Sequence, residues 1–335
     1  MPASHGAYQA AASRYNSMPY RRCGRSGLCL PPICLGLWQH CHDADLLRRL
    51  VTAGFDRGLT HFDLANNYGP PPGAAESAFG QVMADSLRAY RDELVISTKA
   101  GYDMWPGPYG NFGSRKYLTA SLDQSLQRMG LEYVDIFYHH RPDPDTPLEE
   151  TIGALADIVR QGKALYAGIS NYCGERIGEA AALAAAYRLP LVIIQVKYNM
   201  FDRSPEQQVL PHCAAAGQGV IAFSPLAQGL LTDRYVSGVP ADSRAAKGIN
   251  NLARQLTDSR LRQITALNAI AQARGQSLAQ MALTWLLRSD IVAGVIAGAS
   301  SVEQLVDNLA AGEAPALTAE EMAAIDAALA QKGGC

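Results

Sequence analysis

Short apolar segments recur along the chain, and each is bounded by polar or glycine residues. The eight segments are Ile33–Leu37, Thr60–Leu64, Leu94–Thr98, Tyr133–Tyr138, Leu165–Ile169, Leu191–Val196, Val220–Phe223 and Val292–Ala297. Apolar residues run nearly continuously through them instead of alternating with polar ones, which is typical of parallel strands covered on both faces. The pattern therefore predicts eight buried parallel strands.

The stretches between these segments carry apolar residues at helical spacing, as in Asp43–Arg57 and Ser114–Met129. Ser300 is expected to open a further helix over Val302–Leu309, because serine is a favoured N-cap residue. Eight strands alternating with helices predict an α/β fold, a closed (β/α)8 TIM barrel. A doubly wound sheet would need G-x-G-x-x-G directly after the first strand, and residues 36–41 do not supply it.

The ends of the chain and two long connections complete the predicted organisation. Residues 1–19 are expected to be a short polar extension, and residues 20–335 a single barrel domain. The sequence around Gly24–Gly27 predicts a β-hairpin at the bottom of the barrel. The long connections Ala100–Arg115 and Pro225–Ser277 both follow strands, so we expect them at the C-terminal mouth, where barrel enzymes build their active sites.

Composition narrows the class of protein. The net charge of -2 gives no electrostatic reason to expect a nucleic acid or a membrane as partner. The seven cysteines are odd in number and dispersed, and the first residues lack the apolar core of a signal peptide, so a cytoplasmic location is expected. His40-Cys41-His42 has no evident third ligand, and we therefore expect no metal.

Ionisable residues stand at the ends of three successive predicted strands. Asp63 ends the second strand, Tyr68 follows it, Lys99 ends the third, and His139 and His140 end the fourth. A phenol beside a cation can give a proton to a carbonyl that accepts hydride, and a histidine can orient that carbonyl. Each residue alone could be purely structural, and spacing does not choose between the two histidines, but their coincidence favours a catalytic site.

Three motifs resemble the aldo-keto reductase family over about Tyr20 to Leu329: Phe62–Gly69, Ile96–Lys99 and Tyr133–His140. The resemblance implies NADPH-dependent reduction of small aldehydes by hydride transfer. It places the family's catalytic tetrad on Asp63, Tyr68, Lys99 and His140, with Tyr68 as the general acid.

Three further stretches, Asn66–Gly73, Lys99–Gly110 and Gly113–Leu118, resemble the bacterial L-glyceraldehyde 3-phosphate reductases of this family. This resemblance implies substrates such as L-glyceraldehyde 3-phosphate or methylglyoxal, and leaves a homo-oligomer possible. The branch is related to the β subunits of voltage-gated potassium channels, so a redox-sensing regulatory subunit is the alternative interpretation. The channel subunits have asparagine at the position of His140, which favours the enzyme.

The resemblance also implies the residues that bind NADPH. The nicotinamide carboxamide is expected at Ser170, Asn171 and Gln195, with Phe223 stacked on the nicotinamide ring and Trp38 as another aromatic residue beside the cofactor. The pyrophosphate is expected at Ser224, Leu226, Gln228 and Gly229, with Arg234 and Arg244 as basic contacts, and the adenosine end at Gly298, Ser300, Gln304, Asp307 and Asn308. Gly298 and Gln304 are uncharged where many family members hold the adenosine 2′-phosphate with lysine and arginine. Apart from the resemblance, the loop Gly107–Lys116 is expected to overhang the mouth, and Trp105 and Arg115 are the candidate substrate residues. Arg115 is either a contact for a substrate phosphate or a solvated residue at the start of a helix.

Overall fold

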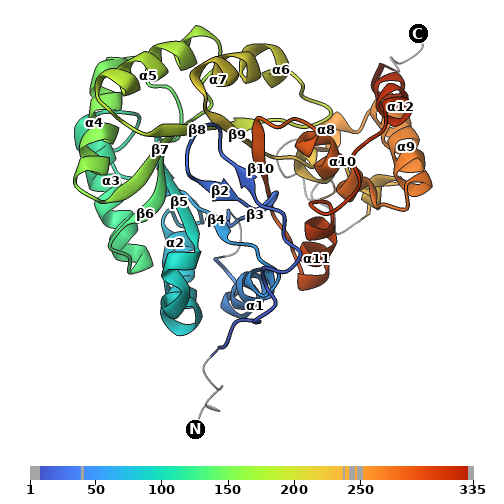
Figure 1. Ribbon diagram of the computed structural model, residues 1–335, viewed down its shortest axis with the longest axis horizontal. Coiled ribbons are helices and arrows are strands. Elements are labelled where there is room, and N and C mark those ends of the chain that lie inside the picture. The colour runs from blue at the N-terminus through green and yellow to red at the C-terminus, as the bar shows by residue number, and fades with distance from the viewer. Residues whose placement is uncertain (1–7, 39–40, 237, 241–245, 247–251, 331–335) are drawn as a thin grey trace.

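Eight parallel strands close into a barrel with helices around it (Figure 1), in a computed structural model that describes residues 8–38, 41–236, 238–240, 246 and 252–330. The order around the barrel is β10-β3-β4-β5-β6-β7-β8-β9. The strands are β3 (Ile33–Gly36), β4 (His61–Asp63), β5 (Val95–Ala100), β6 (Val134–His139), β7 (Ala164–Ser170), β8 (Leu191–Lys197), β9 (Gly219–Phe223) and β10 (Val292–Ala297). The predicted TIM barrel and its eight strand segments are confirmed.

Helices connect the strands and form the outer layer. They are α1 (Ala44–Phe55), α2 (Ala74–Val82), α3 (Arg115–Met129), α4 (Leu148–Arg160), α5 (Glu175–Ala186), α6 (Pro205–Gln208), α7 (Leu210–Ala216), α8 (Leu252–Gln255), α9 (Asp258–Ala273), α10 (Leu278–Leu287), α11 (Val302–Ala310) and α12 (Ala319–Ala330), with short 3₁₀ or π turns over Met83–Leu87, Arg88–Glu93, Ala227–Gly229 and Asp233–Tyr235. None of the helices described is long and apolar enough to cross a membrane.

Local side-chain bonds explain where several helices begin. Asp43 accepts a hydrogen bond from the backbone N–H of Leu46 at the start of α1, and Ser114 caps α3 in the same way. At α11 the expectation was wrong by one residue. Ser301, not Ser300, accepts the N–H of Gln304, while the Ser300 hydroxyl donates to the Gln304 side chain.

The connection Pro225–Ser277 differs from the long loop expected there. Two helices, α8 and the sixteen-residue α9, lie within it. Apolar residues and alanines are spread around α9, so its sequence lacks the single apolar stripe that identifies a surface helix. The other long connection, between β5 and α3, contains neither a helix nor a strand in the structure.

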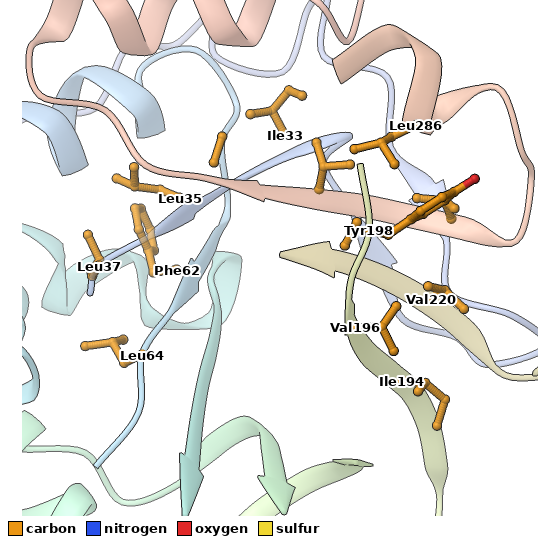
Figure 2. Packing of buried hydrophobic residues seen from close by; sticks show 14 of the residues in the cluster. Ile33, Leu35, Leu37, Phe62, Leu64, Ile194, Val196, Tyr198, Val220 and Leu286 are labelled. Carbon is orange, nitrogen blue, oxygen red and sulfur yellow. The ribbon is translucent and has the colours of Figure 1, made fainter. Parts of the chain in front are cut away.

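Alternate residues of each strand fill two different layers. Cys34, Ile193 and Ile221 point into the barrel, where they pack with one another. Their chain neighbours Ile33 and Ile194 point outward against the helices, and Figure 2 shows this outer layer. Strands such as β3, β8 and β9 are therefore apolar on both faces, which explains why they appear in the sequence as nearly continuous hydrophobic segments.

The predicted hairpin is confirmed as β1 (Arg21–Arg22) paired antiparallel with β2 (Cys29–Leu30). Figure 1 shows it in dark blue across the opening of the strand ring. The N–H of Arg25 donates to the carbonyl of Gly217, just before β9, at 2.9 Å. Leu30 joins the apolar cluster inside the barrel. The hairpin thus closes the end at which the strands begin.

Residues 8–20 pack beside the hairpin end of the barrel. The Tyr8 hydroxyl donates to Asp56 at 2.7 Å, and Arg14 forms an ion pair with Glu93 at 2.7 Å. The Tyr20 hydroxyl donates to the carbonyl of Gly58 at 2.7 Å. This part of the expected polar extension is therefore attached to the segments that precede β4 and β5.

Replacing Gly24 with alanine should destabilise the barrel. Gly24 has a φ of +56°, and a Cβ there would lie 2.3 Å from the carbonyl oxygen of Gly217. We expect Gly24→Ala to reduce the free energy of unfolding by about 1–3 kcal/mol, measured as a lower urea midpoint. Gly27→Ala is the matched control in the same turn, because the nearest atom would be 4.0 Å away. Equal midpoints for the two variants would contradict the role assigned to this close approach.

Candidate active site

The centre of the mouth is a buried ion pair between two barrel strands. Lys99 Nζ lies 2.6 Å from Asp63 Oδ2 and also donates to the carbonyl of Leu64 at 2.6 Å. Both side chains are almost fully buried. Burial alone would lower the pKa of Lys99, but Asp63 and Tyr68 together raise it, so the ammonium stays protonated.

A second layer of side chains holds the Asp63 carboxylate in place. Its Oδ1 accepts hydrogen bonds from Ser97 Oγ at 2.7 Å and from Gln195 Nε2 at 3.2 Å. Ser97 in turn lies 3.0 Å from His61 Nε2. Ser97 and His61 were not among the site residues predicted from the sequence. Their spacing could have identified them, because each stands two residues before a predicted site residue and its side chain therefore points to the same face of the strand.

Tyr68 lies beside the ammonium group of this pair. Its hydroxyl is 3.3 Å from Lys99 Nζ, and Lys99 Nζ is 4.8 Å from the centre of the tyrosine ring. Burial raises the pKa of Tyr68, while the neighbouring Lys99 opposes that rise. The phenol is therefore protonated at neutral pH, with a cation in position to stabilise the phenolate that remains when the proton leaves.

His140 completes the group of four residues that the sequence predicted. Its ring centre lies 6.1 Å from that of Tyr68 and 4.7 Å from that of Tyr102, which it meets edge to face. Burial, with Lys99, His139 and Arg141 nearby, lowers the pKa of His140 well below its usual range. The ring is neutral, and its buried Nδ1 has no hydrogen-bond partner among the described residues.

His139 is not part of this group of four residues and contacts Tyr172 instead. Its Nδ1 lies 2.8 Å from the Tyr172 hydroxyl, and burial lowers its pKa to about 4. The geometry thus separates the two histidines that spacing left equivalent. His140 faces Tyr68, and His139 joins β6 to the loop after β7.

Three of the expected nicotinamide residues lie next to the ion pair. Ser170 ends β7 and Gln195 lies opposite it in β8, and both are buried. Asn171 is exposed, has a φ of +61°, and donates its side-chain amide to the backbone carbonyl of His140 at 2.9 Å. A left-handed asparagine held across two strands is typical of a functional site.

The loop after β9 has an unusual backbone at the residues expected to hold the pyrophosphate. Ser224 and Gln228 have φ of +52° and +60°, and Gly229 has +101°. The Asn199 side chain supports the turn by donating to the Ser224 carbonyl at 3.0 Å. Half-buried Phe223 ends β9, and the expected residues Leu226 and Gln228 are also half-buried.

Two expected basic contacts belong to the same connection. Arg234 lies in the 3₁₀ turn Asp233–Tyr235, and Arg244 lies outside the described residues.

The expected adenosine residues follow β10. Gly298, Ser300 and Gln304 are exposed next to the N-terminus of α11. Asn308 lies behind them and donates to the Gly298 carbonyl at 3.5 Å. Asp307 is directed elsewhere, because its carboxylate accepts hydrogen bonds from Ser277 and Gln280 at the start of α10. Trp38 follows β3, the strand that pairs with β10, and 45% of its surface is exposed.

The two substrate candidates lie at the β5–α3 loop. Trp105 packs against the Tyr117 ring and lines an open hollow of about 550 Å³ with neighbouring loop residues. Arg115 is directed away from the mouth, because its guanidinium forms an ion pair with Asp157 of α4. A different arginine, Arg141, directly follows His140, and its guanidinium lies 4.3 Å from the ring centre of Tyr102.

Metal binding finds no support in the described part of the chain, where no group of three or more histidine, cysteine, aspartate or glutamate residues could hold an ion. His40, which the sequence places between Gln39 and Cys41, lies outside that part. The described residues bring together a proton donor, a buried cation and a neutral histidine at the mouth.

Comparisons with known proteins agree with this geometry. A model of the Aldo/keto reductase family matches residues 32–330. The chain is 53% identical over 325 residues to the L-glyceraldehyde 3-phosphate reductase of Escherichia coli (strain K12), covering 95% of this chain and 94% of the relative. It is 39% identical over 328 residues to a probable voltage-gated potassium channel subunit beta of Oryza sativa subsp. japonica, covering 94% of this chain and 98% of the relative.

The buried histidines should make stability depend on pH. His139 and His61 have pKa values of about 4 in the folded chain, against about 6.5 when unfolded. The unfolded state therefore takes up protons first as the pH falls. We expect the free energy of unfolding to decrease from about pH 6.5 to about pH 4, by up to about 1.4 kcal/mol per pH unit for each histidine.

Two variants test this assignment by urea unfolding across that pH range. His139→Gln removes one titrating group, so the free energy of unfolding should change less steeply with pH, by up to about 1.4 kcal/mol per pH unit. Tyr172→Phe is the control, because it removes the hydrogen bond to His139 and keeps the titrating ring. A wild-type slope in His139→Gln would show that His139 is not one of the groups responsible.

Proposed function

The chain belongs to the aldo/keto reductase family and is an oxidoreductase, and we propose that it reduces small aldehydes with NADPH, with L-glyceraldehyde 3-phosphate as the leading substrate. The observation that carries the proposal is the Tyr68 hydroxyl held 3.3 Å from the buried ammonium of Lys99, itself paired with Asp63. Such a phenol can protonate the oxygen of a carbonyl as hydride reaches its carbon.

A nicotinamide cofactor fits the residues present. Aldo-keto reductases generally use one, and when bound it supplies the hydride. Ser170, Asn171 and Gln195 offer side-chain hydrogen bonds for a carboxamide, and Phe223 offers a half-buried ring for stacking. The left-handed backbone at Ser224 and Gln228 forms a turn of the kind whose backbone N–H groups can bind a pyrophosphate.

The four tetrad residues divide the remaining work. Tyr68 holds the proton that the nascent alkoxide receives. Lys99 stabilises the phenolate left behind, and Asp63 keeps Lys99 charged although the site is buried. His140 is neutral, so its ring can donate a hydrogen bond to the carbonyl oxygen without giving up a proton, which orients the carbonyl toward Tyr68.

NADPH is proposed over NADH with a modest margin. Gly298 and Gln304 offer no positive charge to a 2′-phosphate, but Ser300 and the N-terminal amides of α11 lie at the same place. A helix N-terminus attracts anions, although less specifically than an arginine that binds the phosphate bidentately.

The substrate proposal is supported by the 53% identity to a protein named L-glyceraldehyde 3-phosphate reductase. Methylglyoxal is the second aldehyde to consider, since the same proton donor serves any small carbonyl compound. The similarity to potassium channel β subunits supports a competing proposal, in which bound cofactor reports redox state to a partner.

Oxidation of the reduced coenzyme, followed by its absorbance, tests the proposal with L- and D-glyceraldehyde 3-phosphate, glyceraldehyde and methylglyoxal. We expect turnover with the L-phosphate and a smaller KM for NADPH than for NADH. Inactivity with every aldehyde would reject the reductase, and a preference for NADH would reject the coenzyme assignment. Slow turnover with tightly retained cofactor would favour the regulatory subunit.

Tyr68→Phe should remove the proton donor and leave the fold intact. We expect kcat to fall by on the order of 10²–10⁴, the range for a lost general acid, with cofactor Kd nearly unchanged. Tyr102→Phe is the matched control, because Tyr102 also contacts His140 but has no contact with Lys99 among those observed. A Tyr68→Phe variant that retains kcat would exclude Tyr68 as the acid.

A further inference from the structure

We propose that Arg141 binds the phosphate group of a phosphorylated aldehyde and thereby makes this site selective for such substrates. The proposal rests on the reductase function proposed above. Arg141 directly follows His140, so it stands at the mouth, at the carboxyl end of β6.

The guanidinium of Arg141 is held in one orientation by two aromatic rings. Its Cζ lies 4.3 Å from the ring centre of Tyr102 and 4.3 Å from that of Phe112. Nε donates to the Gly101 carbonyl at 2.8 Å, and Nη2 donates to Asn111 Oδ1 at 2.8 Å. Stacked and hydrogen-bonded in this way, the planar group loses little conformational freedom when it binds an anion.

The positive charge of Arg141 is not matched by a neighbouring carboxylate. Its two acceptors are neutral, and it forms no ion pair with a residue that the structure describes. An indirect link to an acidic residue runs through the Asn111 amide, which donates to Asp103. A guanidinium carries five N–H donors, and those of Nη1 have no partner in the described protein. A phosphate could therefore accept from this group.

Two other basic residues of the neighbouring elements are paired with carboxylates. Arg115 forms an ion pair with Asp157, and Lys197 at the end of β8 lies 3.1 Å from Asp202. Lys116 lies over the exposed Tyr109 ring. Half-buried Arg141 thus combines charge, fixed orientation and free donors, which these three do not.

The position of Arg141 also matches the shape of a short aldehyde phosphate. Tyr102 contacts both groups: its ring centre lies 4.7 Å from that of His140 and 4.3 Å from the Arg141 guanidinium. The cation is therefore about one aromatic ring away from the group proposed to orient the carbonyl. In glyceraldehyde 3-phosphate the phosphate and the carbonyl lie at opposite ends of a three-carbon chain, so both could be bound together.

The backbone of the β5–α3 loop is strained to make this arrangement. Phe112 has a φ of +63°, and its N–H donates to Asn111 Oδ1, the same oxygen that accepts from Arg141. A left-handed phenylalanine is costly and persists where surrounding contacts require it. The loop conformation thus depends on the same atoms that hold the guanidinium.

Substrate selectivity tests the proposal against a purely structural role for Arg141. We expect Arg141→Met to lower kcat/KM for L-glyceraldehyde 3-phosphate by roughly 10- to 100-fold more than for unphosphorylated glyceraldehyde, since one charged hydrogen-bonding partner is lost. Arg160→Met, at an exposed arginine of α4, should leave the ratio unchanged. Equal losses for the two aldehydes would overturn the proposal.

Equilibrium binding separates this proposal from the reductase function. With the coenzyme-loaded protein, calorimetry with glycerol 3-phosphate should show a Kd raised roughly tenfold or more in Arg141→Met, and raised less in Arg141→Lys, which keeps the charge but not the planar fork. Arg141→Lys decides the question if the methionine variant does not fold. An unchanged Kd in the folded variants overturns the proposal. A raised Kd in a protein without turnover supports the phosphate site while rejecting the reductase.

Discussion

The buried Lys99–Asp63 pair is the interaction on which the rest of the site depends. Two charges removed from water are stable only when they are close and when their remaining hydrogen-bonding groups are satisfied. The structure meets both conditions, since Ser97 and Gln195 bond the carboxylate and the Leu64 carbonyl accepts from the ammonium. Each of these partners comes from a different strand or strand end, so the pair requires the closed barrel around it.

Apolar packing on both sides of the strands supplies that closed barrel, and it is also why the fold could be predicted from the sequence. A strand that is buried on both faces is largely apolar, and eight such segments are visible without any structure. Features that depend on tertiary context were less predictable. The pattern does not choose between Ser300 and Ser301 as the helix cap, and α9 has no single apolar face.

The candidate site was predictable to a similar extent and for a related reason. Residues at strand ends have their positions determined by the barrel, so Asp63, Tyr68, Lys99 and His140 come together as the sequence suggested. Residues in loops do not have that constraint. Arg115 pairs with Asp157 and Arg141 lies against two rings, and both contacts depend on tertiary packing that the local sequence does not specify.

The hairpin that closes the bottom of the barrel has a consequence for how this protein can evolve. Cys23 and Leu30 support the base of the strands, whereas the ligand-facing loops leave from the opposite end. Substitutions that alter substrate choice therefore fall in a region where they disturb few of the contacts that maintain the fold. Loop replacement can therefore change the ligand that the mouth accepts while the base of the barrel stays as it is.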